Sequence, residues 1–336
     1  KNVVNLLSNS AQIYDRQVSS LRTSGDTIFL VAGLSGTTLA SKSYNVALVE
    51  ADSLFHAFNK SNYDIDSSRF ARWLPVECYT LPKTQMEIPV GQNLVRFPIY
   101  LKNLDKLSPV SIYLLDYKLN TNITKEFNPL KKEVLLRIYK ENEFASTYKN
   151  TYYNYTTTYV ETLSLSDRLI RRPTNANQIF PLAENSVRML AGDETFGDYK
   201  EALDDINAKS IKVTVGEQTP QNPLARQVTI ESYKTLDLVQ LPPYEMYNNT
   251  YLINILTTPD GRSTYYKEFR LHYKYRLSST LPYKEVKAIY PIHMNPVVRK
   301  EAEEDLGGCD RIRIIEPLDV LDFHNFMARS YLILTD

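Results

Sequence analysis

Carboxylates form the densest groups of chemically reactive side chains in this sequence. The closest-spaced runs are Asp64-Ile-Asp66, Asp204-Asp205 and Glu301–Asp305. Two carboxylates about 5–10 Å apart are enough for glycoside hydrolysis, but spacing along the chain does not give that distance. A calcium loop needs the pattern DxDxDG, which neither Asp64–Ser68 nor Asp193–Asp198 supplies. The carboxylates therefore leave glycosidase chemistry open and predict no metal site.

The other reactive side chains do not stand in a catalytic motif. The sequence contains no GxGxxG, GxxxxGK[ST], HExxH or complete GxSxG, and Gly33-Leu-Ser-Gly36 is one residue short of a nucleophile elbow. The four histidines are His56, His272, His293 and His324, and no two of them have the spacing of metal ligands. His272 alternates with apolar residues, so we expect its ring to lie in water. We predict no catalytic residue, no metal and no cofactor.

Aromatic side chains are the best candidates for a binding site. The chain has 25 Tyr and 12 Phe but a single Trp, which is Trp73. Flat aromatic rings stack well on the C–H faces of sugars, so Trp73, Tyr152, Tyr153 and Tyr155 form the predicted glycan-binding set. Simpler interpretations stay open, because Trp73 next to Leu74-Pro75 fits a core plug and Tyr is a preferred strand residue.

The charge balance and the cysteines exclude further classes. Lys plus Arg number 39 and Asp plus Glu also number 39, whereas a domain that holds a phosphate backbone usually has a basic excess, so we expect no nucleic-acid partner. Cys78 and Cys309 lie far apart and make neither a disulfide framework nor a zinc site, so we expect both to be unpaired. No stretch approaches the roughly 18 apolar residues that span a bilayer.

These side chains are carried on strands in which apolar and polar residues alternate. Phe269, Leu271, Tyr273 and Tyr275 alternate with Arg270, His272 and Lys274 in the clearest example. This is the pattern of a strand with one face on a core and the other in water. The fold class predicted is therefore all-β, with two β-sandwich-like domains and a few short helices.

The expected strands lie at 27–33, 44–50, 94–101, 110–117 and 133–139 in the first half, and at 186–190, 210–215, 227–231, 250–257, 265–276, 285–290 and 311–316 in the second. The turn Pro259-Asp-Gly261 predicts a hairpin. Short helices are expected at 51–59, where Asp52 is placed to cap, and at 196–208 and 297–306. A Tyr-, Thr- and Asn-rich run opens at residue 146, and we divide the chain there into domains 1–145 and 146–336.

Several segments together resemble a pair of domains of unknown function from Bacteroidetes. In the first half they are Val46–Asp52, Phe58-Asn59, Leu74-Pro75, Tyr79–Leu81 and Ile88–Gly91. Their order is similar to that in the N-terminal domain of many surface lipoproteins from polysaccharide-utilisation loci, a domain that also precedes glycosidase domains in some extracellular enzymes. In the second half, Asn185–Met189, Asn249–Tyr251 and Phe269–Tyr275 are similar to the Bacteroidetes-specific domain that often follows.

The resemblance implies a secreted protein of the outer-membrane surface, held by an N-terminal lipid anchor that is not in this chain. It implies a polysaccharide or other glycan as ligand, other outer-membrane glycan-uptake proteins as partners, and no catalytic residues. The sequence departs from the family at Ser108–Ser111 and Tyr113–Leu115, where a "Y.LP" step is usual, so the register of that strand stays open.

Three functions are compatible with the sequence. The first is a non-catalytic surface protein that binds a glycan or assists its uptake. The second is a structural or adhesion-type surface protein that makes protein contacts. The third is a glycoside hydrolase whose carboxylate pair the sequence does not reveal. A cleft with two carboxylates would favour the enzyme, and exposed aromatic faces would favour glycan binding.

Overall fold

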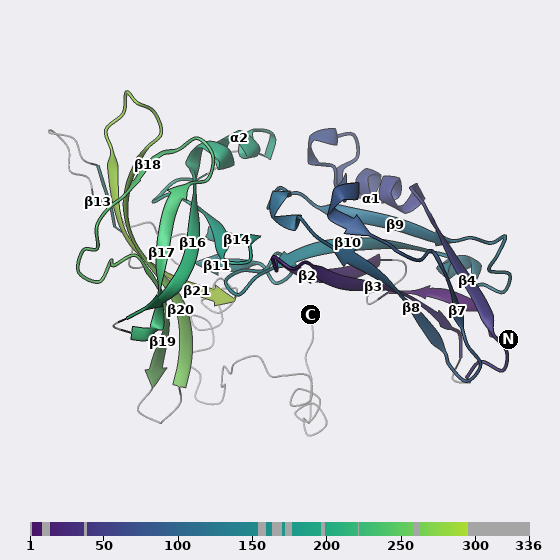
Figure 1. The fold of residues 1–336 in the computed structure, drawn as a ribbon. Coiled ribbons are helices and arrows are strands. Elements are labelled where there is room, and N and C mark those ends of the chain that lie inside the picture. Colours follow the sequence, from purple (N-terminus) through teal and green to yellow (C-terminus); the bar gives the residue numbers. More distant parts are fainter. Residues whose placement is uncertain are drawn as a thin grey trace, which may run out of the picture. The chain divides into compact units, whose positions relative to one another are not determined.

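The protein is an all-β molecule with a few short helices, as predicted (Figure 1). The computed structural model describes residues 2–8, 14–36, 39–153, 159–162, 170–171, 177–195, 199–220, 222–257 and 263–294. Residues Lys1–Met294 form one compact unit, and Asn295–Asp336 lie outside the described residues. No helix within the described ranges is long and apolar enough to cross a membrane.

The first half folds into an N-terminal sandwich. Its strands are β1 (Val4–Leu7), β2 (Tyr14–Ser20), β3 (Asp26–Leu34), β4 (Tyr44–Glu50), β5 (Arg72–Trp73), β6 (Tyr79–Thr80), β7 (Gln85–Ile88), β8 (Leu94–Leu101), β9 (Tyr113–Leu119) and β10 (Glu133–Glu141). Its helices are α1 (Ser53–Tyr63) and the 3₁₀ turns η1 (Ser67–Arg69), η2 (Val76–Cys78), η3 (Leu104–Lys106) and η4 (Pro129–Lys131). One sheet has the order β1-β3-β8-β6 and the other β2-β10-β9-β4-β7, with β5 beside β9.

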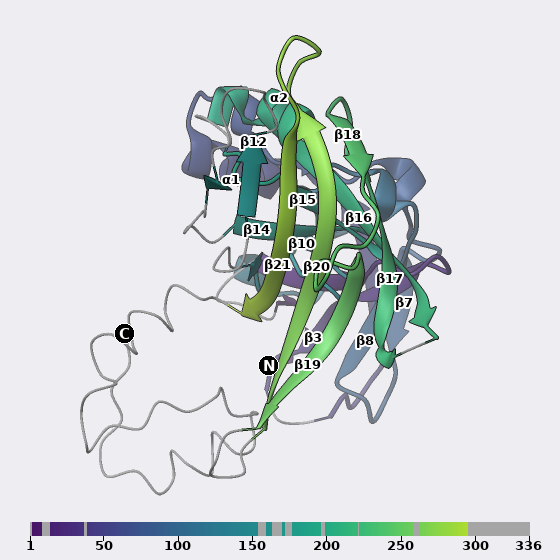
Figure 2. The same cartoon turned by 90° about the vertical axis from the view of Figure 1, so that its left-hand side faces the viewer.

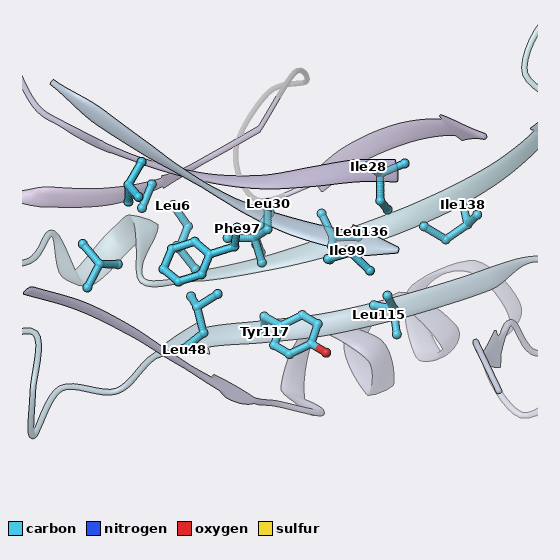
Figure 3. Packing of buried hydrophobic residues seen from close by; sticks show 14 of the residues in the cluster. Leu6, Ile28, Leu30, Leu48, Phe97, Ile99, Leu115, Tyr117, Leu136 and Ile138 are labelled. Atoms are coloured by element: carbon cyan, nitrogen blue, oxygen red, sulfur yellow. The ribbon is translucent and has the colours of Figure 1, made fainter. Parts of the chain in front are cut away.

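The core of the sandwich lies between these two sheets. Leu30 and Phe97 come from β3 and β8 of one sheet, and Leu115 and Leu136 come from β9 and β10 of the other (Figure 3). All four side chains are at most 3% exposed. Side chains on a strand alternate between its faces, so the neighbours of these residues point to the outer faces of the sheets.

Helix α1 covers the outer face of the second sheet. Phe55 of α1 packs with Ala71, with Leu114 of β9 and with Leu135 of β10 in a separate small cluster. The sequence predicted that Asp52 caps this helix, and that prediction is wrong: the Asp52 side chain makes no cap hydrogen bond. Asp116 of β9 does so instead, because its Oδ2 accepts from the backbone N–H groups of Leu54 and Phe55 at 3.0 and 3.1 Å.

The cap gives the protein a testable dependence on pH. Burial, with the nearby Glu133 carboxylate, raises the pKa of Asp116 from 3.8 to about 6. Between these values the folded state binds more protons than the unfolded state, so this group lowers the free energy of unfolding as the pH rises. Asn does not titrate, so Asp116→Asn should avoid this loss. We therefore expect the free energy of unfolding of Asp116→Asn, measured in urea relative to that of the wild type, to be higher at pH 7 than at pH 4.

The control for this experiment is Asp52→Asn at the same helix end. Asp52 makes no cap hydrogen bond, so its substitution should give the same difference from the wild type at both pH values. A difference between Asp116→Asn and the wild type that is constant from pH 4 to pH 7 would contradict the assignment.

The second half folds into one eleven-stranded sheet, here called the C-terminal sheet. Its strands are β11 (Thr151–Tyr153), β12 (Tyr159–Thr162), β13 (Ile170–Arg171), β14 (Asn177–Ala183), β15 (Ser186–Leu190), β16 (Ser210–Thr219), β17 (Asn222–Ser232), β18 (Asp237–Gln240), β19 (Thr250–Thr257), β20 (Ser263–Arg276) and β21 (Lys284–Met294). Helix α2 (Tyr199–Lys209) follows β15.

The C-terminal sheet curls until it meets itself. Strand β21 pairs with β20 on one side and with β11 on the other, and the chain of pairings β11-β14-β15-β16-β17-β19-β20 completes a ring. Figure 2 shows β19, β20 and β21 as long neighbouring strands of this curled sheet. Closure buries one face of every strand in the ring against a common interior.

Large side chains fill that interior. Phe269, Leu271, Tyr273 and Tyr275 of β20 are all fully buried, which confirms the predicted alternation. The prediction that His272 lies in water is wrong, because its side chain is only 8% exposed and its ring contacts the Pro242 carbonyl in the loop that follows β18. The loop after β18 covers His272 on the outer face of the sheet, and the alternation of residues within a strand does not predict such a cover.

Most strands agree with the sequence, and β4, β8, β15 and β19 have the predicted ends. Strand β9 begins at Tyr113 instead of Val110, since the turn at Ser108-Pro109 is closed by a hydrogen bond from the Ser108 N–H to the Tyr113 hydroxyl. Strands β19 and β20 pair as a hairpin, although its turn lies outside the described residues. The same holds for the predicted elements at 297–306 and 311–316.

The division of the chain at residue 145 stays a prediction. The hydrophobic cluster of the N-terminal sandwich extends to Ile138, and Phe144 and Ala145 already pack in the cluster of the C-terminal sheet. Cys78 is a buried free thiol, and Cys309 lies outside the described residues.

Candidate functional site

A cleft of about 820 Å³ lies against the outer face of the C-terminal sheet. Gln227 of β17, Thr250 of β19 and Arg270 of β20 stand side by side in register across three strands and form its floor. Residues paired in this way project from the same face, which is opposite to the one that carries Phe269 and Leu271. Ala225 and Leu252, also paired, add an apolar strip to the floor.

The wall of the cleft is the loop of residues 241–249 between β18 and β19. Asn249 holds both ends of this loop, because its Nδ2 donates to the Leu241 carbonyl at 2.8 Å and its Oδ1 accepts from the His272 N–H at 2.8 Å. The His272 ring adds a contact of 2.6 Å from Nδ1 to the Pro242 carbonyl. Its other ring nitrogen, Nε2, lies 2.8 Å from Glu285 Oε1. The loop is thus fixed to the sheet, and the cleft exists before any ligand binds.

The side chain of Gln240 closes a gap in the strand pairing beside the cleft. Strand β17 pairs with β19 only as far as Gln227. Beyond that point Gln240 of β18 accepts from the Ile230 N–H at 2.7 Å and donates to the Val228 carbonyl at 3.3 Å. A side-chain amide carries the same donor and acceptor as a peptide group, so Gln240 substitutes for a strand neighbour.

Uncommitted amide groups face this cleft. Gln227 is exposed and its side chain bonds to none of the other residues that the structure describes. Asn222 and Asn248 use their side-chain oxygens to accept from Leu224 N–H and Thr250 Oγ1, at 2.9 and 2.6 Å, which leaves their amide N–H groups available. Free carboxamides can both donate to and accept from neutral hydroxyl groups.

Arg270 is the one ionisable side chain among the described residues that line the cleft. Its guanidinium pairs with the buried carboxylate of Glu268, with Nε at 2.7 Å and Nη2 at 2.6 Å from Oε1. The described lining contains no Asp, Glu or His, so it offers neither the acid nor the base that glycoside hydrolysis requires. The chemistry available in the cleft is hydrogen bonding and apolar contact.

Trp73 is a half-exposed aromatic surface on the N-terminal sandwich. It lies on β5 beside β9, and one face of its ring stacks on Phe55 with centroids 3.8 Å apart and planes at 12°. The side chain is 41% exposed, so it is not a core plug. Phe55 supports one face of the indole, and an apolar sugar face could use the exposed part.

The predicted tyrosines do not extend this surface. Tyr153 is fully buried in the core of the C-terminal sheet and its hydroxyl donates to the Leu190 carbonyl, so the prediction that Tyr153 binds a glycan is wrong. Tyr152, its neighbour on β11, is half-buried, and Tyr155 lies outside the described residues. Trp73 and Tyr152 belong to different sheets.

The cleft was missed at the sequence level, although two signals mark its wall. Pro242-Pro243 and Asn248-Asn249 are turn residues on either side of the short stretch Tyr244–Tyr247, and they predict a loop. They do not predict that the loop folds back over β20. Within the described ranges no group of His, Cys, Asp or Glu could hold a metal ion.

Two family models match most of the described chain. One, described as an N-terminal domain, matches residues 5–125, and the other, described as a C-terminal domain, matches residues 132–290. A protein of unknown function from Bacteroides ovatus has a similar structure over 88% of this chain and 94% of its own, with a TM-score of 0.59 and 16% identity.

Two further solved structures share this fold. A multidomain protein including DUF1735 from Bacteroides ovatus covers 86% of this chain and 93% of its own, with a TM-score of 0.59 and 14% identity. An auxiliary nutrient binding protein from Bacteroides thetaiotaomicron VPI-5482 covers 85% of this chain and 92% of its own, with a TM-score of 0.58 and 12% identity. At these identities the likeness concerns the fold.

The end of the chain is similar to a different family, which the sequence analysis did not detect. Residues 262–336 match the family model of UDP-N-acetylglucosamine 2-epimerase. The epimerase of Bacillus subtilis (strain 168) is 54% identical over 54 residues, and that of Yersinia pestis is 46% identical over 52. Each alignment covers 16% of this chain and 14% of the enzyme, so this chain spans about one seventh of the curated relatives it matches.

Proposed function

We propose that this chain, which has the Bacteroidetes architecture of an N-terminal domain of unknown function followed by a C-terminal one, is a non-catalytic accessory protein that binds a glycan. The observation that carries the proposal is the cleft on the C-terminal sheet. It is preformed, it presents free carboxamides over an apolar strip, and its described lining contains no carboxylate. Small-molecule sites typically have this combination of concave shape and few oriented polar groups.

The relatives agree with this proposal without deciding it. The structure described as an auxiliary nutrient binding protein shares the fold over most of both chains. The epimerase-like segment supports no second function here, since it spans 14% of the curated enzymes. The proposal includes a place at the outer-membrane surface in a polysaccharide-utilisation system, together with other glycan-uptake proteins. Protease treatment of intact cells that leaves the protein uncut would contradict that location.

The direct test is affinity electrophoresis through gels that contain plant, host and microbial polysaccharides. We expect retardation by at least one of them, and we expect Gln227→Ala/Asn248→Ala to weaken the affinity about thirtyfold, since two hydrogen bonds of about 1 kcal/mol each are lost. The matched control is Gln178→Ala, a residue of β14 whose side chain bonds to Asn150 away from the lining of the cleft.

Three other outcomes would redirect the assignment. Retardation lost in Trp73→Ala but kept in the cleft variant would move the binding site to the Trp73–Phe55 stack. No retardation across the panel would favour the structural or adhesion-type function. Release of oligosaccharides from a polysaccharide would establish a glycosidase.

A further inference from the structure

We propose that the cleft on the C-terminal sheet selects uncharged glycans and rejects acidic ones. This inference rests on the proposed function and adds the charge class of the ligand. It depends on one ion pair, Arg270 with Glu268, which decides whether the floor of the cleft presents a positive charge.

Arg270 is already engaged by a carboxylate of the protein. Glu268 lies two residues earlier on β20, so both side chains project from the outer face of the sheet. Two nitrogens of Arg270 lie 2.7 and 2.6 Å from the same Glu268 oxygen, and the two side chains are 25% and 10% exposed. A partly buried pair of this kind is screened little by salt, so it competes effectively with a carboxylate on a ligand.

The rest of the described lining carries no charge that could replace Arg270. The donors that stay available are the carboxamides of Gln227, Asn222 and Asn248. A uronate, sialate or sulfate entering the cleft would lose its hydration without gaining a free cation, because the charge of Arg270 is already neutralised by Glu268. Neutral hydroxyl and acetamido groups lose less hydration and match the amides.

The test removes the charge of Glu268, which should allow the cleft to bind acidic polysaccharides. In Glu268→Gln the shape of the floor is preserved, and Arg270 keeps its charge without a charged partner. We expect the wild type to be retarded by at least one of dextran, yeast mannan, galactomannan or xyloglucan, and not by polygalacturonate, hyaluronan or chondroitin sulfate. Glu268→Gln should gain affinity for an acidic polysaccharide by about tenfold or more.

Two further variants test whether the gain of affinity for acidic polysaccharides arises in the cleft. Glu231→Gln makes the same change of net charge at an exposed pair with Lys212, and it should gain no affinity for acidic polysaccharides. Glu268→Gln/Arg270→Gln removes both charges and should return to the wild-type selectivity. The double variant also tests the inference if Glu268→Gln fails to fold, because replacing both partners leaves no unpaired charge.

The outcomes separate the inference from the proposed function. Retardation of the wild type by an acidic polysaccharide, lost in the double variant, would overturn the inference and keep the function. A folded Glu268→Gln that gains no acidic ligand, or gains it equally with Glu231→Gln, would also overturn the inference. A wild type that binds no polysaccharide of either class would overturn the proposed function itself.

Discussion

Lys284→Met should lower the free energy of unfolding by about 3 kcal/mol, which is the typical cost of removing one partner from a buried ion pair. Lys284 Nζ lies 2.6 Å from Glu194 Oε1 and 3.2 Å from Asp193 Oδ1, and both carboxylates are at most 11% exposed. Burial opposes its charge, yet the hydrogen bonds to Glu194 and Asp193 raise the pKa of Lys284 above its usual value. The substitution would leave two nearly buried carboxylates without a cation.

The carboxylates are also fixed by the core, so they cannot easily turn to water. The hydroxyl of the fully buried Tyr275 donates to Glu194 at 2.8 Å, and the neighbouring Gly192 N–H donates to Tyr273 at 2.8 Å. Urea or thermal unfolding measures the effect. The control is Lys212→Met, whose pair with Glu231 is 40% and 54% exposed and should contribute less than about 1 kcal/mol. Equal losses in the two variants would contradict the argument.

Arg188→Met should have the opposite sign and raise the free energy of unfolding by about 2 kcal/mol. Arg188 is 2% exposed, and burial lowers the pKa of its guanidinium to about 10. Its Nη1 donates to Ser210 Oγ at 3.3 Å, its Nε has no hydrogen-bond partner, and no carboxylate pairs with it among the described residues. Desolvation of the charge is therefore poorly offset.

The contact of Arg188 with an aromatic ring does not reverse this balance. The guanidinium carbon lies 4.3 Å from the centroid of the Phe180 ring, an attraction of about 2 kcal/mol when desolvated, and Met also packs well on aromatic rings. Lys212→Met again serves as the control, since Lys212 stands next to Arg188 in register on β16 and is exposed. A destabilised Arg188→Met would show that the guanidinium has a stronger partner than the described contacts.

These two predictions show why residue type alone is a poor guide to energetics in this chain. Lys284 and Arg188 are both basic residues on strands of the same sheet, although Lys284 is 29% exposed and Arg188 only 2%. One neutralises carboxylates that the fold has already buried, and the other carries a charge into a site without a described counter-ion. The sign of each effect follows from the neighbours that the sheet supplies.

The strands themselves were predictable because their signal is local. Alternation of apolar and polar residues at a period of two is set by the geometry of a single strand, and it located β4, β8, β15 and β19 to the residue. The same alternation in both halves predicted an all-β molecule. Short elements such as β5 and β6 were missed, since two residues carry no periodicity.

The site could not be predicted, because it depends on residues that are distant in sequence. The sequence shows that apolar and polar residues alternate along β20. Only the pairing of β21 with both β20 and β11 closes the sheet and buries Tyr153. The same is true of the cleft, whose wall is held by Asn249 and His272 across intervening strands. Local pattern fixes which face of a strand is apolar, whereas hydrogen bonds between distant segments decide what covers the other face.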